Sequence, residues 1–533
     1  MQQGSPSTIP EALHSTAERG QGEYVFHLDD GPVRLSCPEL AERAERGARR
    51  LAALGVGPGD PVGVLGPNRP EWVVSAFAIW TAGAVVVPMQ LPVRIRDPRA
   101  FEEQQRAVLA SAGSERVLSD PRLASLLPTG VAAPWDEEGG SSAEDPPPPG
   151  SEDPAVIQFT SGSTATPRGA LIPHSAAMAQ MEILDGLVSG PTGPRSSVHW
   201  VPFFHDMGLF LTVLTPAIWG ATCHYLPTER FARDPAEWLR LVEAHRAHSI
   251  LGPSTAFGSA LRAVERRDER PDLSSLELVR LVAEAVDPGV AARLTEAAPR
   301  FGLKPETLGS GYGLAEAVLA VTLTVPGEGL QVDRISLDAL AAENVALDAA
   351  EGRTRTIASS GPSLKLDLRI AGPNGEPLEE RQVGEILLHG ASLMSRYIGA
   401  KAPDPFSEDG WLATGDMGYV ANGELYVTGR ATDMVIVMGH NYYPEDFEWA
   451  AGRVEGVRPG RCVAFTRQGT EEVIVLVESN GEIEAHTLEK KVRNAVSDAV
   501  GVSPAEVLAL EPGAVQKTTS GKLRRAAMRD LHA

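Results

Sequence analysis

The first clear element of the chain is a stretch of helical periodicity at residues 38–54. Its apolar positions, which Arg and Glu residues separate, are Leu40, Ala44, Ala48, Leu51 and Leu54. An apolar stripe that repeats every three to four residues predicts an amphipathic helix with one face on a core. A turn at 58–60 follows, and the apolar run at 62–65 predicts a short buried strand.

The next apolar stretch, 72–93, contains 22 residues without a charge and is long enough to span a bilayer. Two prolines and Gly83 interrupt it, however, and β-branched valines fill positions 85–87. A buried helix followed by a buried strand explains this pattern better than a membrane span. The resulting alternation of strands and helices predicts a parallel α/β sheet.

This alternation continues to about residue 300, where a predicted helix at 235–248 leads into a strand at 250–251. An acidic stretch rich in Gly and Pro at 135–154 interrupts it and predicts a solvated surface loop. From 382 to 427, short apolar runs between turn residues predict a small β-rich subdomain.

The last part of the chain combines predicted strands at 434–437 and 472–477 with a charged helix at 487–499. The predicted fold class is therefore α/β. A large N-terminal domain of parallel-rich α/β sheets with a small β-rich subdomain precedes a small α+β C-terminal domain.

Charge and cysteine content exclude several functional classes. The 533 residues include 48 Lys and Arg against 70 Asp and Glu, a formal net charge of −22. Such a field repels phosphate backbones and anionic lipids, so nucleic acid and membrane surfaces are not expected partners. The cysteines, Cys37, Cys223 and Cys462, show neither disulfide nor zinc spacing, and residues 1–20 lack the apolar core of a signal peptide. We therefore expect a cytoplasmic protein.

A run of small hydroxyl residues and glycines follows the apolar strand at 155–157. Backbone N–H groups and hydroxyls in such a loop can surround phosphate oxygens, and a guanidinium adds a charge-assisted contact. The GxxxxGK[ST] pattern of a Walker loop is absent, and a plain surface turn is the alternative. The candidate phosphate ligands are Thr160, Ser161, Gly162, Ser163, Thr164 and Arg168.

This loop resembles the phosphate-binding loop of the superfamily of adenylate-forming enzymes, which contains acyl-CoA synthetases, the adenylation domains of peptide synthetases and luciferases. The resemblance implies that His205 lies near the acyl carboxylate. It also implies that Tyr312 and Gly313 hold adenine and that Glu316 is a ligand of Mg²⁺. The further matching segments, in the family's order, are 200–209, 311–316, 414–416, 429–433 and 519–522.

Four more site residues follow from the same resemblance. Asp416 and Arg430 are expected to contact the ribose, and Arg430 also marks the interdomain hinge. Glu284 belongs to the segment on the adenine side. Lys522 is expected to be the catalytic lysine, and His205 and Glu316 complete the catalytic set.

The chemistry of adenylation is consistent with a lysine in that role. A carboxylate oxygen attacks the α-phosphorus while both partners are negative, so a cation is needed where charge accumulates. The alternative is that Lys522 belongs to a solvated basic tail with Lys517, Arg524 and Arg525. We expect His205 to position the substrate and not to pair with Asp206, because neighbours in an extended segment point in opposite directions.

Details of the sequence resemble the fatty acyl-AMP ligase branch, namely the segments 203–208, 313–320 and 439–446. A stretch from 332 to about 350 resembles the insertion that limits the use of coenzyme A in this branch. The branch passes the acyl group to the phosphopantetheine of a carrier protein instead.

The chain departs from the family pattern at Ala165 and Arg168 and in the segment 282–285. Ala restricts φ compared with Gly, and Arg is not a geometric equivalent of Lys. One hypothesis is therefore that ATP use is weak and that the enzyme converts a preformed acyl-adenylate and CoA to acyl-CoA.

The resulting interpretation is a ligase with an N-terminal domain at 1–431 that binds the acid and ATP, and a mobile C-terminal lid at 432–533. Its expected ligands are ATP or acyl-AMP, Mg²⁺, an apolar carboxylic acid, and the thiol of coenzyme A or of a carrier's phosphopantetheine. An amino-acid-activating domain and a catalytically silent nucleotide- or acyl-binding protein remain alternatives.

Overall fold

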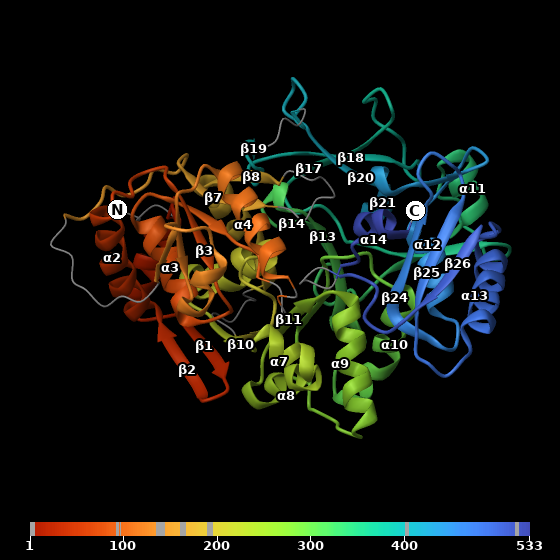
Figure 1. The fold of residues 1–533 in the computed structure, drawn as a ribbon, viewed down its shortest axis with the longest axis horizontal. Helices are drawn as coiled ribbons and strands as arrows, with labels where there is room; N and C mark the ends of the chain where they lie inside the picture. The colour runs from red at the N-terminus through yellow and green to blue at the C-terminus, as the bar shows by residue number, and fades with distance from the viewer. Residues whose placement is uncertain are drawn as a thin grey trace.

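The computed structural model of the chain describes residues 6–91, 95, 97–134, 144–159, 167–188, 196–399, 404–517 and 522–532. Two large sheets with helices packed on them form the N-terminal part. A β-rich segment crosses the top of the view in Figure 1 and leads to a smaller α+β unit at the right.

A seven-stranded sheet contains the strand predicted at 62–65. Parallel pairing joins β3 to β4 and β5, and the antiparallel pairs β7–β8 and β8–β19 form one end of the sheet. Its strand order is β19 (Arg396–Gly399), β8 (Arg168–Pro173), β7 (Pro154–Phe159), β4 (Val85–Pro88), β3 (Pro61–Leu65), β5 (Arg116–Ser119), β6 (Ala132–Pro134).

An eight-stranded sheet contains the strand predicted at 250–251. Its central pairs are parallel, and antiparallel pairs close its two edges. Its order is β14 (Ala320–Leu323), β13 (Leu308–Gly313), β12 (Leu278–Leu281), β11 (Ser249–Gly252), β9 (Ser196–His199), β10 (Thr222–Tyr225), β1 (Glu23–Leu28), β2 (Gly31–Ser36).

Helices connect and cover these strands. Their bounds are α1 (Ile9–Glu18), α2 (Cys37–Ala53), α3 (Pro70–Thr81), α4 (Pro98–Ala112), α5 (His174–Val188), α6 (Leu214–Trp219), α7 (Thr228–Arg233), α8 (Ala236–His245), α9 (Ser254–Arg266) and α10 (Pro288–Ala297), with a π-helix η2 (Met207–Val213) before α6. The helices predicted at 38–54 and 235–248 are confirmed as α2 and α8.

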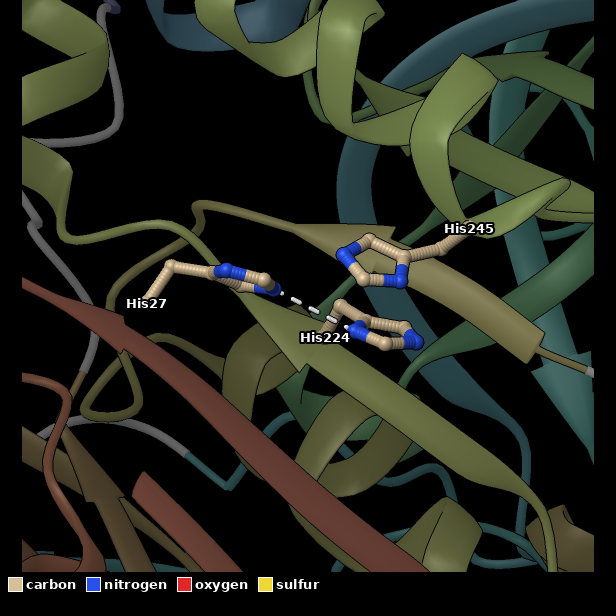
Figure 2. Close-up of side chains that lie close together, drawn as sticks. All are labelled: His27, His224 and His245. Carbon is tan, nitrogen blue, oxygen red and sulfur yellow. Dashed lines mark hydrogen bonds between the residues drawn. The ribbon is translucent and has the colours of Figure 1, made fainter. Parts of the chain in front are cut away.

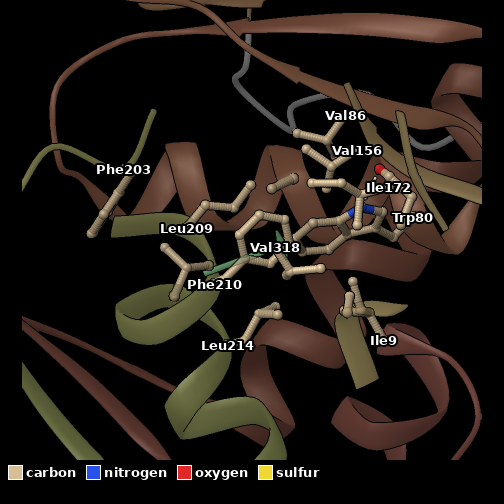
Figure 3. Packing of buried hydrophobic residues seen from close by; sticks show 14 of the residues in the cluster. Ile9, Trp80, Val86, Val156, Ile172, Phe203, Leu209, Phe210, Leu214 and Val318 are labelled. Atoms are coloured by element: carbon tan, nitrogen blue, oxygen red, sulfur yellow. Dashed lines mark hydrogen bonds between the residues drawn. The ribbon is translucent and has the colours of Figure 1, made fainter. Parts of the chain in front are cut away.

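The uncharged stretch 72–93 forms α3 and β4, as predicted for a buried helix and a buried strand. Trp80 of α3 lies in the main hydrophobic core among residues of several elements (Figure 3), and its indole N–H donates to the carbonyl of Ala155 at 2.9 Å. No helix among the described residues is both long and apolar enough to cross a membrane. Of the loop predicted at 135–154, residues 135–143 lie outside the described residues, and 144–153 contain neither helix nor strand.

The predicted β-rich subdomain is an antiparallel sheet of β17 (Asp367–Ala371), β18 (Gly384–His389), β20 (Leu412–Ala421) and β21 (Glu424–Arg430). Before it, β15 (Val332–Ser336), α11 (Leu337–Glu343) and β16 (Thr354–Ala358) form a separate hairpin unit, which we call the insertion hairpin.

The C-terminal part is α+β, as predicted. The hairpin β22 (Val435–Val437) and β23 (His440–Tyr442) precedes a three-stranded sheet of β24 (Val457–Thr466), β25 (Val473–Ser479) and β26 (Glu506–Leu510). Its helices are α12 (Pro444–Gly452), α13 (Ala485–Val500) and α14 (Arg525–His532). One hydrophobic cluster joins Leu337 and Leu340 of the insertion hairpin to Phe447 of α12 and Val492 of α13, so the hairpin packs against the C-terminal part.

Candidate functional site

The predicted phosphate loop follows β7 in the sequence. Thr160, Ser161, Gly162, Ser163 and Thr164 lie outside the described residues, but both flanking strands are defined. At the end of β7, the side-chain amide of Gln158 donates to the carbonyl of Phe204 at 3.0 Å. This bond joins the start of the loop to the segment that carries His205.

Arg168 lies at the start of β8, on the other side of the phosphate loop. Its guanidinium carbon is 5.2 Å from the centre of the Tyr397 ring, a cation–π contact across the β8–β19 pair. Arg168 therefore lies next to the partner of Glu316, because the hydroxyl of Tyr397 donates to Oε1 of Glu316 at 2.6 Å. Burial and the negative charge of Glu316 raise the pKa of Tyr397, so its hydroxyl stays a donor.

Glu316 lies in a short 3₁₀ turn, η5 (Ala315–Ala317), between β13 and β14. The next residue but one, Val318, has φ 64 and ψ −57, and the N–H of Leu319 donates to the carbonyl of Ala317 at 2.7 Å. These features define a γ-turn, which is strained for a β-branched residue. Gly313 precedes this turn, and a Cβ there would lie 1.8 Å from the carbonyl oxygen of Leu319, so only glycine fits. No sequence pattern had indicated the γ-turn.

Asp416 of β20 lies at the centre of a three-residue cluster. The hydroxyl of Tyr312 donates to its Oδ2 at 2.7 Å, and Nε of Arg430 donates to its Oδ1 at 2.9 Å. Asp416 and Arg430 are direct partners across the β20–β21 pair, and Tyr312 is on β13. The charge of Asp416 raises the pKa of Arg430, and burial, with the same charge, raises that of Tyr312. Three predicted nucleotide ligands from two different sheets therefore meet at one carboxylate.

His205 and Asp206 contradict the expectation that they point apart. Nδ1 of His205 is 2.5 Å from Oδ1 of Asp206, and Asp206 also accepts from the N–H of Met207 at 2.6 Å. The expectation was wrong because Asp206 has helical φ and ψ, −49 and −49, as the N-cap of η2, so the segment is not extended here. The backbone just before His205 is held by Asn68, a buried residue that the sequence analysis did not single out. Asn68 donates to the carbonyl of Val201 at 2.8 Å and accepts from the N–H of Phe203 at 3.0 Å.

Lys522 lies within electrostatic reach of this pair. Burial acts to raise the pKa of Asp206, but the charges of His205 and Lys522 and the hydrogen bonds to Asp206 outweigh it and lower the pKa to about 2. The charge of the C-terminal lysine therefore acts on the His205 segment, although the two are more than three hundred residues apart in the sequence.

Two residues of the basic tail considered above, Arg525 and Lys517, are not solvated side chains. Arg525 makes ion pairs with Glu445 and Glu448 of α12 at 2.6 and 2.8 Å. Burial lowers the pKa of Lys517, and the negative charge of Glu284 acts in the opposite direction.

Glu284 itself accepts from the hydroxyl of Ser254 at 2.9 Å and from the N–H of Thr255 at 2.8 Å, both at the start of α9. Its contacts therefore lie with α9 and the C-terminal part, and the structure does not record one with Tyr312 or Asp416.

The donor set fits a nucleotide and a hard cation. Asp416 can accept from ribose hydroxyls, Arg168, Arg430 and Lys522 supply positive charge for phosphates, and Glu316 offers the oxygen ligand that Mg²⁺ prefers. These side chains come from both large sheets, the β-rich subdomain and the C-terminal part.

This fold and this site define an adenylate-forming enzyme. The family model described as "AMP-binding enzyme" matches residues 13–398, so the chain belongs to that family.

Known relatives match over nearly their full length. The chain is 36% identical to a protein named putative ligase Rv1013 of Mycobacterium tuberculosis (98% of each chain), and 32% identical to a putative acyl-CoA synthetase of Caulobacter vibrioides (97% of this chain, 94% of that one). It is 30% identical to the long-chain-fatty-acid–AMP ligase FadD26 of Mycobacterium marinum (98% and 96%). A solved structure from a study of fatty acyl-adenylate ligases from E. coli and L. pneumophila superposes with a TM-score of 0.90 at 29% identity, covering 98% of this chain and 97% of that one.

Proposed function

We propose that the chain activates an apolar carboxylic acid with ATP and then passes the acyl group to a thiol. In the first step a carboxylate oxygen attacks the α-phosphorus, which forms acyl-AMP and releases pyrophosphate. In the second step the thiol sulfur attacks the acyl carbonyl, AMP leaves, and the thiol proton goes to solvent or to a base. Formation of an acyl-adenylate is the activity of the family to which the chain belongs.

The observation that carries the proposal is that the charge of Lys522 acts on the carboxylate of Asp206, the partner of His205. It supports a lysine at the place where the acid and the α-phosphate would meet, next to His205. In this role Lys522 stabilises the charge that develops as two negative groups react, and the carboxylate of Asp206 orients the imidazole of His205.

The other site residues then bind and orient the nucleotide. Asp416 would accept from the ribose hydroxyls, while Tyr312 stacks on adenine and Arg430 approaches the ribose and phosphates. Mg²⁺, when bound at Glu316, would neutralise phosphate charge. Thr160 to Thr164 would surround the phosphate oxygens, and Arg168 would add positive charge.

An apolar acid is favoured by the residues that follow His205. All seven residues of η2 are buried, and Leu209 and Phe210 belong to the main core cluster (Figure 3). Apart from Asp206, no charged residue occurs in 198–214, so an amino acid would lack an additional carboxylate there for its ammonium group. The name of the relative FadD26, a long-chain-fatty-acid–AMP ligase, supports the same substrate class.

We further propose that residues 432–533 act as the lid and that a carrier protein's phosphopantetheine is the acceptor in preference to free coenzyme A. The support is the way the insertion hairpin holds the C-terminal part. Arg355 of β16 forms a buried ion pair with Asp446 of α12, Nε to Oδ1 at 3.0 Å. Its guanidinium also lies 5.0 Å from the Tyr443 ring. A lid fastened at this point has less freedom to rotate.

The test is a pair of half-reaction assays. Exchange of labelled pyrophosphate into ATP, with fatty acids of graded length, measures adenylation, and Lys522→Ala should abolish it while the fold is retained. Acyl-AMP with either CoA or a phosphopantetheinylated carrier then measures transfer. Thioester from acyl-AMP without any exchange would show that adenylation has been lost. If neither the exchange assay nor the transfer assay gave a product, the chain would be a silent binding protein and the proposal would be refuted.

A further inference from the structure

Three histidines from separate elements lie together beside the neighbouring strands β1 and β10 of the eight-stranded sheet (Figure 2). His27 is on β1, His224 is on the adjacent strand β10, and His245 is the last residue of α8. Nε2 of His27 and Nδ1 of His224 are 3.2 Å apart, and the rings of His224 and His245 stack with centroids 3.9 Å apart. One nitrogen of each ring lies within 4.8 Å of the other two, an arrangement that no other three His, Cys, Asp or Glu side chains in the described part of the chain share.

All three side chains are imidazoles, which bind transition metals through a ring nitrogen that has no proton. His224 is buried, and His27 and His245 are half-buried, so the three ring nitrogens meet in a partly enclosed site.

Positive charge near the cluster is compensated. Arg34 and Arg230 both act on the histidines, but Arg34 pairs with Glu23 at 2.6 Å and Arg230 pairs with Glu237. Nη1 of Arg230 also donates to the carbonyl of His27 at 2.7 Å, which fixes the backbone of this ligand. The two arginines next to the cluster are therefore each paired with a carboxylate, which offsets their positive charge.

One pair of ring nitrogens lies close to the spacing of tetrahedral coordination. With metal–nitrogen bonds of about 2.0–2.1 Å, two tetrahedral ligands are separated by roughly 3.3–3.4 Å. The separation of 3.2 Å between Nε2 of His27 and Nδ1 of His224 is near this value, and the proton of their hydrogen bond would leave when a metal binds. His245 must turn out of its stack on His224, and it can do so because it is half-buried and ends its helix.

We propose that His27, His224 and His245 form a binding site for one divalent transition-metal ion, with Zn²⁺ as the best fit. Three neutral nitrogen ligands suit zinc, copper or nickel and do not suit Mg²⁺, so this site is chemically separate from Glu316. A fourth position remains for water. The bound ion would join the N-terminal strand β1 to α8 and would stabilise the native state by mass action.

The experiment is a Zn²⁺ titration of tag-free, chelator-stripped protein in competition with a chromophoric chelator. Wild type should bind one tight equivalent, and Co²⁺ in its place should show the visible absorption of a tetrahedral site. His245→Gln should weaken binding by at least about tenfold. His486→Gln, at an exposed position of α13, is the matched control and should bind like wild type.

Thermal unfolding gives the second measurement. Zn²⁺ should raise the Tm of wild type and of His486→Gln, and should leave that of His245→Gln unchanged. His27→Gln provides an independent ligand variant if one of them folds poorly. The proposal is overturned if wild type binds no tight Zn²⁺, or if folded His245→Gln and His27→Gln both bind it as wild type does. Neither result depends on adenylation, so the proposed function is tested separately.

Discussion

The guanidinium of Arg525 forms a bidentate ion pair with the carboxylate of Glu448, Nε to Oε1 and Nη2 to Oε2, both at 2.8 Å. Glu448 is 6% exposed, and Arg525 also reaches Glu445 and Asp433. Arg525 follows Lys522 by three residues, so these ion pairs fix the segment that carries the proposed catalytic lysine to α12 and to Asp433, at the proposed hinge.

Arg525→Gln should therefore lower the rate of pyrophosphate exchange about tenfold or more while KM for ATP changes little. The reason is that Lys522 would lose its fixed position, whereas the nucleotide ligands on β13, β20 and β21 would not move. Arg524→Gln, an exposed neighbour with the same change of charge, is the control and should behave like wild type. Unchanged exchange by folded Arg525→Gln would show that the ion pair does not position Lys522.

Asp416→Asn should raise KM for ATP by roughly 10- to 100-fold, the loss expected for charged hydrogen bonds worth about 1.5–3 kcal/mol. The substitution removes the negative charge of the carboxylate to which Tyr312 and Arg430 donate and to which the ribose hydroxyls would donate. Steady-state kinetics measure KM for ATP, with Asp367→Asn on the exposed edge of β17 as the control. Equal KM values for the two variants would exclude Asp416 as a nucleotide ligand.

The γ-turn at Val318 gives an unusual order of stabilities. Val318 is fully buried, so Val318→Ala should destabilise the fold by about 2 kcal/mol through lost packing. Val318→Gly loses more side chain but relieves a backbone strain of about 1–3 kcal/mol. We expect the glycine variant to be at least as stable as the alanine variant in urea unfolding. A glycine variant less stable by more than about 1 kcal/mol, the ordinary cost of glycine, would contradict the strain.

Acid should destabilise the protein below pH 6.5 through its buried neutral histidines. Burial lowers the pKa of His199 to about 3 from a usual value near 6.5. As pH falls from 6.5 toward 3, the unfolded chain binds a proton that the folded chain does not, so stability present above pH 6.5 is progressively lost.

His199→Gln should accordingly reduce the slope of unfolding free energy against pH by up to about 1.4 kcal/mol per pH unit between about pH 6 and 4. Urea unfolding at several pH values measures this slope. His486→Gln, at an exposed site, should leave it unchanged, and a wild-type slope in His199→Gln would contradict the assignment.

The Arg355–Asp446 ion pair predicts a marked asymmetry between single and double substitutions. Both side chains are buried, at 4% and 3% exposure, so Arg355→Met leaves an unpaired carboxylate and should cost about 3–5 kcal/mol. The double variant Arg355→Met with Asp446→Leu should recover most of that loss. Arg353 lies two positions before Arg355 and forms an exposed ion pair with Asp338. Arg353→Met, which breaks that pair, should cost less than about 1 kcal/mol. Chemical denaturation checks this order.

Local sequence patterns determined much of this protein. Hydrophobic patterning was enough to predict α2, α8 and α13 and the buried helix and strand at 72–93, because the spacing of apolar residues reports which parts of an element are buried. Motif resemblance singled out Lys522, Asp416 and Arg430 as site residues, and their catalytic and nucleotide-binding roles stay predictions.

Only the tertiary structure decided which residues meet. Tyr397 donates to Glu316 across 81 positions, Tyr312 to Asp416 across 104, and the three histidines at the sheet edge come from β1, β10 and α8. His205 and Asp206 are adjacent in sequence, yet their contact required a helical backbone at Asp206. The physical reason is the same in each case. Periodicity reports which face of an element is buried, whereas a contact depends on strand order, on helix start points and on local φ and ψ, which the packing of the whole chain sets.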